Sequence, residues 1–417
     1  MLTVRAMSAG NNALISPPLT LLCLASYEKG HRFLQEAKRQ GCRVFLVTSH
    51  SLKETGRWPL DCLEDIFYMP DENHAWNLRD MLLAVCHLCR TRQIDRIVAL
   101  DDFDVEKAAM LREHLRLPGL GESAARYFRD KLAMRICAAE NGIPVPEFTS
   151  IVNYERVSRF LETVCPPWVL KPRLMAGAIG IKKFHHQQDV WDRQHIGDEQ
   201  SFCILERFVP GDIFHVDSIW SRGEPAYSVA SAYGTPPLEV SHDGGIFTTR
   251  ILEKDSEIAR GLLWLNERVL RAFRLTDGVS HTEFIRAHED GSLYFLETSA
   301  RVGGAHISDL IETATGINMW AEWAKVEIAS ACQQAYTPPA VRNDYAGLLV
   351  SLAREEWPDT SGFRDAEVAW RMKKRHHIGF IVKSGSYERV GELLAQYTDR
   401  VRNEFHASAP VRETVRE

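Results

Sequence analysis

The chain has 417 residues, of which 45% are hydrophobic, and this length allows large buried cores in about two to four lobes. Its 50 basic and 56 acidic side chains give a formal net charge of −6, which argues against a general nucleic-acid or polyanion-binding protein. The sequence shows no secretory signal pattern at its start and no run of about 18 apolar residues, so we expect a cytoplasmic protein with no membrane partner.

The nine cysteines are scattered, mostly inside apolar segments, which is typical of a reducing compartment. Cys86 and Cys89 have CxxC spacing in a helix-like run, but no second pair of cysteines follows. We therefore interpret them as core or surface thiols, with a zinc or redox site as the weaker alternative.

The first part of the chain alternates apolar strands with helical patterns, which predicts a parallel sheet covered by helices. Asp101 and Asp102 end the third strand, where open α/β sheets place ligands, although capping of the next helix explains them equally well. The first strand is not followed by GxGxxG, which argues against a nicotinamide site. The expected strands are 19–26, 43–49 and 95–102, and the expected helices are 27–41, 81–91 and 105–115.

A Leu-Pro-Gly-Leu-Gly segment at 117–121 marks the predicted start of a second domain, and the helical run 123–141 that follows carries Lys131. Residues 168–184 predict a strand, a loop of small residues and a second strand. Small residues let backbone N–H groups approach phosphate oxygens, and Lys171 closes the strand just before that loop. A plain glycine turn beside a lysine explains the same pattern.

Residues 201–220 predict a strand, a Pro-Gly turn and another strand, with Glu206 ending the first apolar run. An extended backbone edge with a carboxylate nearby can recognise an adenine amino group and a ribose hydroxyl, but an ordinary hairpin fits as well. Residues 241–250 predict a Gly-rich loop, and helices are expected at 257–273 and 309–331.

Two alternating runs at 281–304 flank Glu289-Asp290-Gly291 and predict a β-hairpin. A turn centred on Asp290 places Glu283 opposite Glu297. Alternation then puts His281, Ser299 and Arg301 on the same face as these two carboxylates. Opposed carboxylates repel one another, and a divalent cation such as Mg²⁺ between them removes that cost. The alternative is a solvated hairpin face.

After Pro338-Pro339 the composition changes to strand-like runs at 345–353 and 376–385 and a helix at 386–405, which predicts a small α+β lobe. The fold class expected for the whole chain is therefore α/β and α+β multidomain. The predicted domains are 1–120, 121–335 and 336–417.

The order of these motifs resembles the ATP-grasp superfamily, and the resemblance is densest over 121–312. It rests on Lys131 in FRDKLAMR, Lys171 before a Gly-rich loop, ERFVPGD, and the hairpin that ends in SARVGG. The pattern is most similar to that of carboxylate–amine ligases and biotin-carboxylase-like members. The resemblance implies a parallel N-terminal α/β lobe, a central ATP-grasp domain with a mobile lid at about 150–205, and a small C-terminal α+β lobe.

The resemblance also implies a role for each matched residue, with ATP and Mg²⁺, or Mn²⁺ in its place, as the cofactors. Arg301 and Lys171 would be catalytic, Arg301 on the reacting carboxylate and Lys171 on the ATP phosphates. Glu283, Glu297 and Ser299 would form the metal site, although relatives usually have Asn at the position of Ser299. The residues expected to bind ATP are Lys131, Lys171, Gly177, Gly180, Glu206, Arg207, Phe208, Val209, Asp212 and Ile285.

The function implied is ATP-dependent ligation of a carboxylate, activated as an acyl phosphate, to an amine such as an amino acid, with release of ADP and phosphate. Two alternatives are a carboxylase or thiol-forming ligase of the biotin-carboxylase-like type and a non-catalytic nucleotide-binding protein. Arg250, His242 and His306 are the candidates to face the substrate, and a structural role explains each of them equally well. The partners implied are small molecules. A homodimer is common in the family, and the sequence leaves the oligomeric state open.

Overall fold

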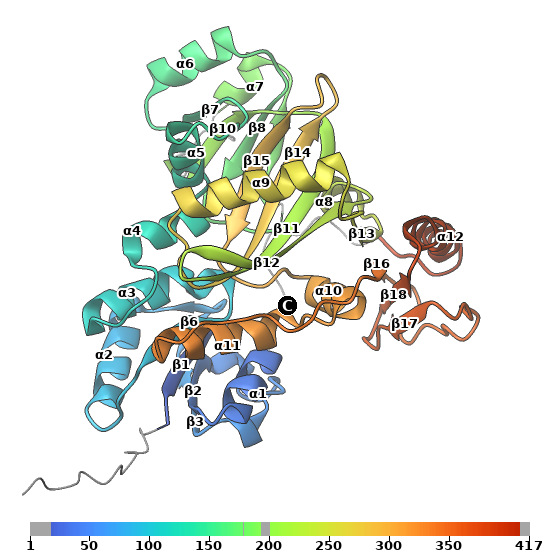
Figure 1. The fold of residues 1–417 in the computed structure, drawn as a ribbon. Helices are drawn as coiled ribbons and strands as arrows, with labels where there is room; N and C mark the ends of the chain where they lie inside the picture. The colour runs from blue at the N-terminus through green and yellow to red at the C-terminus, as the bar shows by residue number, and fades with distance from the viewer. Residues whose placement is uncertain (1–17, 178, 193–200, 409–417) are drawn as a thin grey trace, which may run out of the picture.

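The computed structural model describes residues 18–177, 179–192 and 201–408, which form three lobes around a large central sheet (Figure 1). The first lobe contains a parallel four-stranded sheet in the order β3-β2-β1-β6. Its strands are β1 (Thr20–Ala25), β2 (Arg43–Ser49), β3 (Asp65–Met69) and β6 (Arg96–Ala99), and its helices are α1 (His31–Arg39), α2 (Leu78–Cys89) and α3 (Val105–Leu115).

The parallel, helix-covered sheet confirms the prediction from alternating strands and helices. Strand β3 was missed because four of its five residues keep some solvent exposure, so it lacks the apolar run of a central strand. The long helix α11 (Met319–Ala331), from much later in the chain, packs on α1 and covers part of this lobe (Figure 1). A short ribbon of β4 (Asp71–Glu72) and β5 (Ala75–Trp76) completes the lobe.

The second lobe holds an antiparallel sheet in the order β7-β10-β8-β9, with its own small core around Trp168 and Leu205. Its elements are β7 (Phe148–Ser150), α6 (Tyr154–Thr163), β8 (Trp168–Pro172), β9 (Lys182–Phe184), α7 (Gln187–Trp191) and β10 (Cys203–Arg207). Helices α4 (Glu122–Ala125) and α5 (Lys131–Glu140) connect it to the first lobe (Figure 1).

An eight-stranded sheet in the order β15-β14-β11-β12-β13-β16-β18-β17 joins the centre of the molecule to its C-terminal part. Helix α9 crosses the front of its first strands, and α12 packs on β16 and β18 (Figure 1). The strands are β11 (Gly211–Ser221), β12 (Glu224–Tyr233), β13 (Phe247–Ile251), β14 (Gly278–Ala287), β15 (Leu293–Ser299), β16 (Tyr345–Leu352), β17 (Val368–Arg371) and β18 (His377–Ser384). The helices are α8 (Pro237–Asp243), α9 (Glu257–Ala272), α10 (Ile307–Thr315) and α12 (Tyr387–Glu404).

The segment 201–220 has the predicted strand, Pro-Gly turn and strand, but the two strands, β10 and β11, belong to different sheets, so the alternative of an ordinary hairpin is wrong. Two local predictions were wrong. The predicted loop 241–250 contains the end of α8 and most of β13. The single helix predicted at 309–331 is two helices, because Gly316 adopts a left-handed φ of 80° and Asn318 caps the second one.

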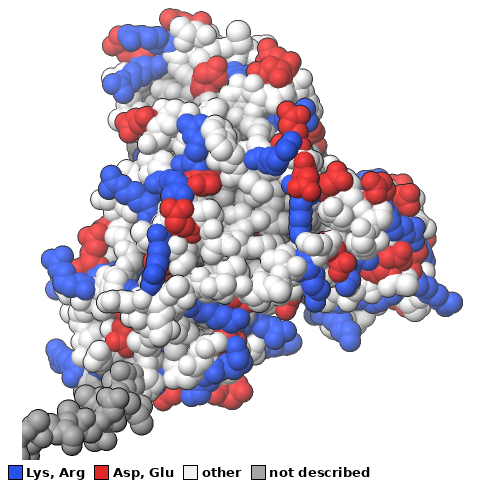
Figure 2. Space-filling model, viewed as in Figure 1, with Lys and Arg blue, Asp and Glu red and all other residues white. Residues whose placement is uncertain are grey.

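No helix in the described part of the chain combines the length and the apolar character needed to cross a membrane. On the face drawn in Figure 2, the described basic and acidic side chains are interspersed, with no broad field of one sign. This pattern agrees with the near balance of charges in the sequence.

Candidate active site

A cavity of about 900 Å³ lies between the antiparallel sheet β7-β10-β8-β9 and the face of strands β11 to β15. It collects polar residues from all four of the motifs identified in the sequence. Of the residues expected from the sequence, those that line it are Lys131, Lys171, Gly177, Arg207, Phe208, Val209, Asp212, Glu283, Ile285, Glu297, Ser299 and Arg301.

The hairpin of β14 and β15 has the predicted register at the two opposed carboxylates. Glu283 pairs with Glu297, and His281 pairs with Ser299. Between Glu283 and the turn the register shifts by one residue, so the turn is not the symmetric one expected. The shift lies on the turn side of the two carboxylates, which therefore stay opposed on the cavity wall.

Lys131 joins the hairpin to the loop that follows β8. It is the first residue of α5, directly after the N-cap Asp130, whose carboxylate accepts hydrogen bonds from the first turn of the helix. The Nζ atom of Lys131 lies 2.7 Å from Glu297 Oε2 and donates to the Met175 carbonyl at 2.7 Å. One of the two opposed carboxylates thus already has a cation beside it.

Glu206 lies behind the cavity wall, fully buried between two cations. Its carboxylate oxygens are 2.6 Å from Arg135 Nε and 2.7 Å from Lys171 Nζ. Burial alone would raise the pKa of this carboxyl, but Arg135 and Lys171 outweigh burial and lower the pKa to about 2. Glu206 therefore anchors Lys171, and its carboxylate does not face the cavity.

The connection from β10 to β11 lines one end of the cavity with Arg207, Phe208 and Val209. Val209 and Ile285 share a small apolar cluster, and the Nζ atom of Lys183 lies 3.6 Å from the centre of the Phe208 ring. This end offers an apolar slot beside an extended backbone edge. Asp212, at the mouth, is exposed and lies 3.1 Å from His288 Nε2.

Arg301 and Ser299 meet a carboxylate that the sequence left ambiguous. Asp102, at the end of the first-lobe sheet, lines the cavity and forms an ion pair with Arg129. Burial would raise the pKa of Asp102, but the charges of Arg129 and Arg301 and a hydrogen bond from Ser299 keep it below its usual value. The buried Nε of Arg301 has no hydrogen-bond partner among the described residues.

For Asp101 and Asp102 the sequence left helix capping as the alternative to a ligand site. Asp101 has the capping role, because it accepts a hydrogen bond from the backbone N–H of Phe103. The strand end at 101–102 was a signal in the sequence. Neither Arg129 nor Tyr233, which also lines the cavity, had a signal of that kind.

The loop between β8 and β9 reaches the cavity through Gly177, which has a left-handed φ of 70° and open space around it. Gly180, at φ 71°, packs against Pro172 and is not among the lining residues. Both positions need the conformational freedom of glycine. Ala178 lies outside the described residues.

The candidates for substrate contact are not gathered in the cavity. Arg250 stacks on Tyr387 of α12, 3.9 Å from the ring centre, and donates to its hydroxyl at 2.7 Å. His306 bonds to Asp309 at 2.7 Å and does not belong to the described cavity wall. His242 falls in α8, and its side chain lies outside the described part of the structure.

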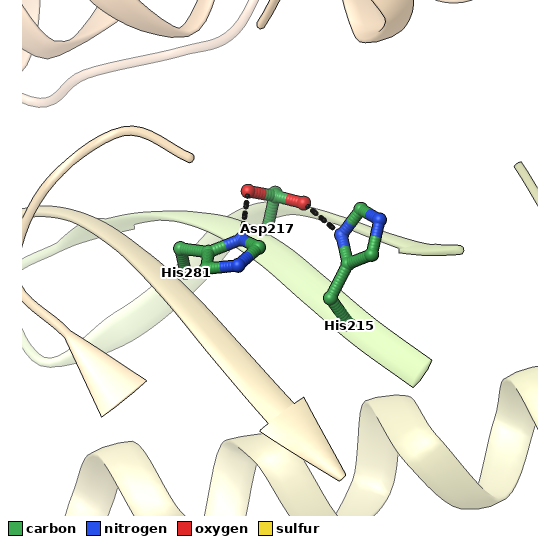
Figure 3. A group of neighbouring side chains, drawn as sticks. All are labelled: His215, Asp217 and His281. Carbon is green, nitrogen blue, oxygen red and sulfur yellow. Dashed lines mark hydrogen bonds and ion pairs between the residues drawn. The ribbon is translucent and has the colours of Figure 1, made fainter. Parts of the chain in front are cut away.

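A row of buried polar residues lies beside Glu283, because the register of β11 against β14 pairs His215 with Glu283 and Asp217 with His281. Figure 3 shows the three side chains of this row, His215, Asp217 and His281. The two carboxylate oxygens of Asp217, on β11, form hydrogen bonds with His215 Nδ1 at 2.7 Å and with His281 Nδ1 at 2.9 Å. Burial lowers the pKa of His215. For His281 burial acts in the same direction, but Asp217 and Glu283 outweigh it and raise the pKa to about 9. Polar residues at alternate positions of the apolar run FHVDSIW were the available sequence signal.

The residues present fit a divalent cation and a nucleotide. Glu283, Glu297 and Ser299 offer a set of hard oxygen donors on one wall, which is the donor type that Mg²⁺ prefers. The unpartnered Nε of Arg301 and the ammonium of Lys131 suit anionic groups beside that metal.

No protein-family profile matches the chain, but individual relatives do. An L-arginine-specific L-amino acid ligase of Bacillus subtilis is 28% identical over 322 residues, which cover 74% of this chain and 76% of the relative. The crystal structure of an L-amino acid ligase from Bacillus licheniformis superimposes with a TM-score of 0.72 at 18% identity, covering 93% of this chain and 98% of that one.

The same fold occurs in the biotin carboxylase domain of the 2-oxoglutarate carboxylase from Hydrogenobacter thermophilus, whose structure is a dimer with MgADP, ADP and bicarbonate. Its TM-score is 0.67 at 14% identity, with 94% of this chain and 91% of that chain covered.

Proposed function

The chain belongs to the ATP-grasp superfamily of ligases, and on this premise we propose that it joins the carboxylate of one amino acid to the amine of a second small molecule. The reaction consumes ATP and releases ADP and phosphate. The observation that carries the proposal is the pair of opposed carboxylates, Glu283 and Glu297, in one cavity with Lys131 and Arg301. The amino-acid substrate class is supported by the sequence relative, an L-amino acid ligase.

The adenine base of ATP and Mg²⁺ fit different parts of this cavity. The slot formed by Val209 and Ile285 suits the adenine base, and the backbone of Arg207 to Val209 provides the edge that would read it. Glu283 and Glu297 would hold Mg²⁺, with Ser299 as a further oxygen donor. When bound, the metal neutralises phosphate charge and aligns the phosphates for transfer.

The residues of the chain supply positioning and charge for the reaction. Lys131 and Lys171 would neutralise the phosphates, and Glu206 keeps Lys171 in place through a 2.7 Å ion pair. Arg301 would orient the substrate carboxylate, whose oxygen attacks the γ-phosphate of ATP to give an acyl phosphate and ADP. The amine then attacks the acyl carbon, an amide forms, and phosphate leaves.

The loop that carries Gly177 is placed to shield this chemistry from water. It lies at the cavity edge and belongs to a sheet with its own core, separate from the strands that carry the two carboxylates. We propose that residues of about 150–205 close as a lid over ATP, within domains of 1–120, 121–335 and 336–417. Slower proteolysis of the 150–205 segment with ATP and Mg²⁺ present would support the lid, and equal rates would contradict it.

Three further features stay predictions. Mn²⁺ is expected to replace Mg²⁺, because the same oxygen donors suit both ions. A homodimer is expected by analogy with the carboxylase domain described above, and light scattering would test it. A cytoplasmic location is expected from the sequence alone.

The test is ADP release, measured first without substrate and then against a panel of amino acids alone and in pairs. The proposal predicts release that depends on an amino acid and a product with the mass of the dipeptide. Release stimulated only by bicarbonate, or tight ATP binding with no stimulation by any compound, would contradict it. The first outcome would indicate the carboxylase alternative, and the second would indicate a non-catalytic nucleotide-binding protein.

A further inference from the structure

Four polar side chains form a continuous hydrogen-bonded row that runs from behind the cavity wall to its lining. The row begins at Thr249 on β13, whose hydroxyl lies 2.8 Å from His215 Nε2. It continues through His215 and Asp217 on β11 to His281 on β14, as Figure 3 shows. His215, Asp217 and His281 are all at least nine-tenths buried.

Tyr233 connects the row to the proposed metal carboxylate. Its hydroxyl donates to Glu283 Oε1 at 2.8 Å and lies 3.4 Å from His281 Nε2. The register of β11 against β14 sets Asp217 beside His281 and His215 beside Glu283. Tyr233 therefore fixes the carboxylate of Glu283, and the hydrogen-bonded row fixes Tyr233 through His281.

The row also supports the loop that carries Arg301. A methyl group in place of the Gly303 hydrogen would lie 2.8 Å from Asp217 Oδ1 and 3.0 Å from His281 Nδ1. The backbone two residues after Arg301 thus rests directly on the Asp217–His281 bond. Only glycine allows this approach.

Two histidines and an aspartate could themselves bind a metal ion, but here their polar atoms satisfy one another. Each imidazole Nδ1 bonds a different oxygen of Asp217, and His215 Nε2 bonds Thr249. An ion would have to break these contacts in a region with little exposure to solvent. The observed geometry is that of a supporting network.

We propose that Tyr233, together with the Asp217 row, is a positioning network that fixes Glu283 and the Arg301 loop relative to each other. The inference rests on the proposed function, because it takes Glu283 as a metal ligand. Partners that orient metal ligands typically contribute 10- to 100-fold to metal affinity. The network would apply that effect to one of the two opposed carboxylates.

The test uses Tyr233→Phe, which removes the hydroxyl and keeps the ring. Tyr227→Phe is the matched control, because Tyr227 lies on the same strand and its hydroxyl bonds Thr315 and not Glu283. Mn²⁺ binding in the presence of ADP is measured by the electron paramagnetic resonance signal of free Mn²⁺. We expect Mn²⁺ affinity to fall about 10- to 100-fold in Tyr233→Phe and to stay unchanged in Tyr227→Phe, with equal metal-free ADP binding in both.

The outcomes separate this inference from the proposed function. If the wild type with ADP binds no Mn²⁺, the metal site of the proposed function fails. If the wild type binds Mn²⁺ and Tyr233→Phe binds it equally well, the positioning role alone is overturned. A metal ion retained after chelation and lost in Asp217→Asn would also overturn it, since the row would then be a metal site.

Discussion

Replacing Glu206 by Gln is expected to destabilise the protein strongly, although Glu206 does not line the cavity. The carboxylate is fully buried, with Arg135 at 2.6 Å and Lys171 at 2.7 Å. Glutamine keeps the shape but removes the negative charge. The buried Arg135 and the partly buried Lys171 then face each other without a counterion, which is the costly way to break a buried ion pair.

The size of the expected loss in folding free energy follows from two independent arguments. Lowering the pKa of Glu206 from 4.5 to about 2 corresponds to about 3 kcal/mol of folding free energy at neutral pH. Removing one member of a buried ion pair typically costs about 3–5 kcal/mol. In a domain of about 200 residues, such a loss lowers the midpoint of thermal unfolding by roughly 10 °C.

The assay is thermal unfolding without nucleotide, with Glu162→Gln as the control because Glu162 is exposed on α6. Since the folded-state pKa of Glu206 is depressed, its contribution is complete above pH 4.5 and is lost as the pH falls toward 2. The difference in unfolding midpoint between the wild type and Glu206→Gln should therefore become smaller below pH 4.5. A midpoint within 2 °C of the control at pH 7 would refute the reasoning.

The remaining predictions concern the cavity and one residue outside it. Glu297→Gln should lower the Mg²⁺-dependent kcat/KM by at least about 100-fold, because it removes one opposed carboxylate and the 2.7 Å partner of Lys131; unchanged turnover would exclude the hairpin from the mechanism. Arg301→Lys should lower kcat/KM for the amino acid by about 10²- to 10³-fold and leave ADP affinity unaltered, since an ammonium cannot replace the guanidinium fork; weaker ADP binding would place Arg301 elsewhere. Arg250→Leu should cost about 1–2 kcal/mol of stability by removing the contact with Tyr387 and leave KM for substrates unchanged, and a raised KM would restore Arg250 as a substrate residue.

The sequence was sufficient to predict the parts of the candidate site that depend on local alternation within a hairpin. The opposition of Glu283 and Glu297 follows from a short hairpin with period-2 patterning, and the structure has that pairing. The shift in register near the turn was not predicted, because alternation alone does not say where a bulge inserts one extra residue into a strand. The break at Gly316 could have been found, since a glycine followed by the N-cap Asn318 ends one helix and begins another.

Contacts between distant segments were beyond the sequence. The ion pairs of Glu206 join residues from α5, β8 and β10, and sequence patterns do not say which cations will meet a buried carboxylate. Likewise, Asp102 reaches Ser299 across nearly 200 positions. The resemblance to ATP-grasp ligases singled out Ser299 as a departure from the usual Asn at a proposed metal-site position. The structure adds that its hydroxyl bonds a carboxylate of the first lobe.

The central claim is that a carboxylate oxygen of the substrate attacks the γ-phosphate of ATP. The most direct test gives the enzyme ATP, Mg²⁺ and the amino acid that most stimulates ADP release, labelled with ¹⁸O in its carboxylate, together with an amine acceptor. Each amide formed should release one phosphate that carries a single ¹⁸O atom from that carboxylate. Amide formation with unlabelled phosphate would contradict an acyl phosphate and therefore the proposed reaction.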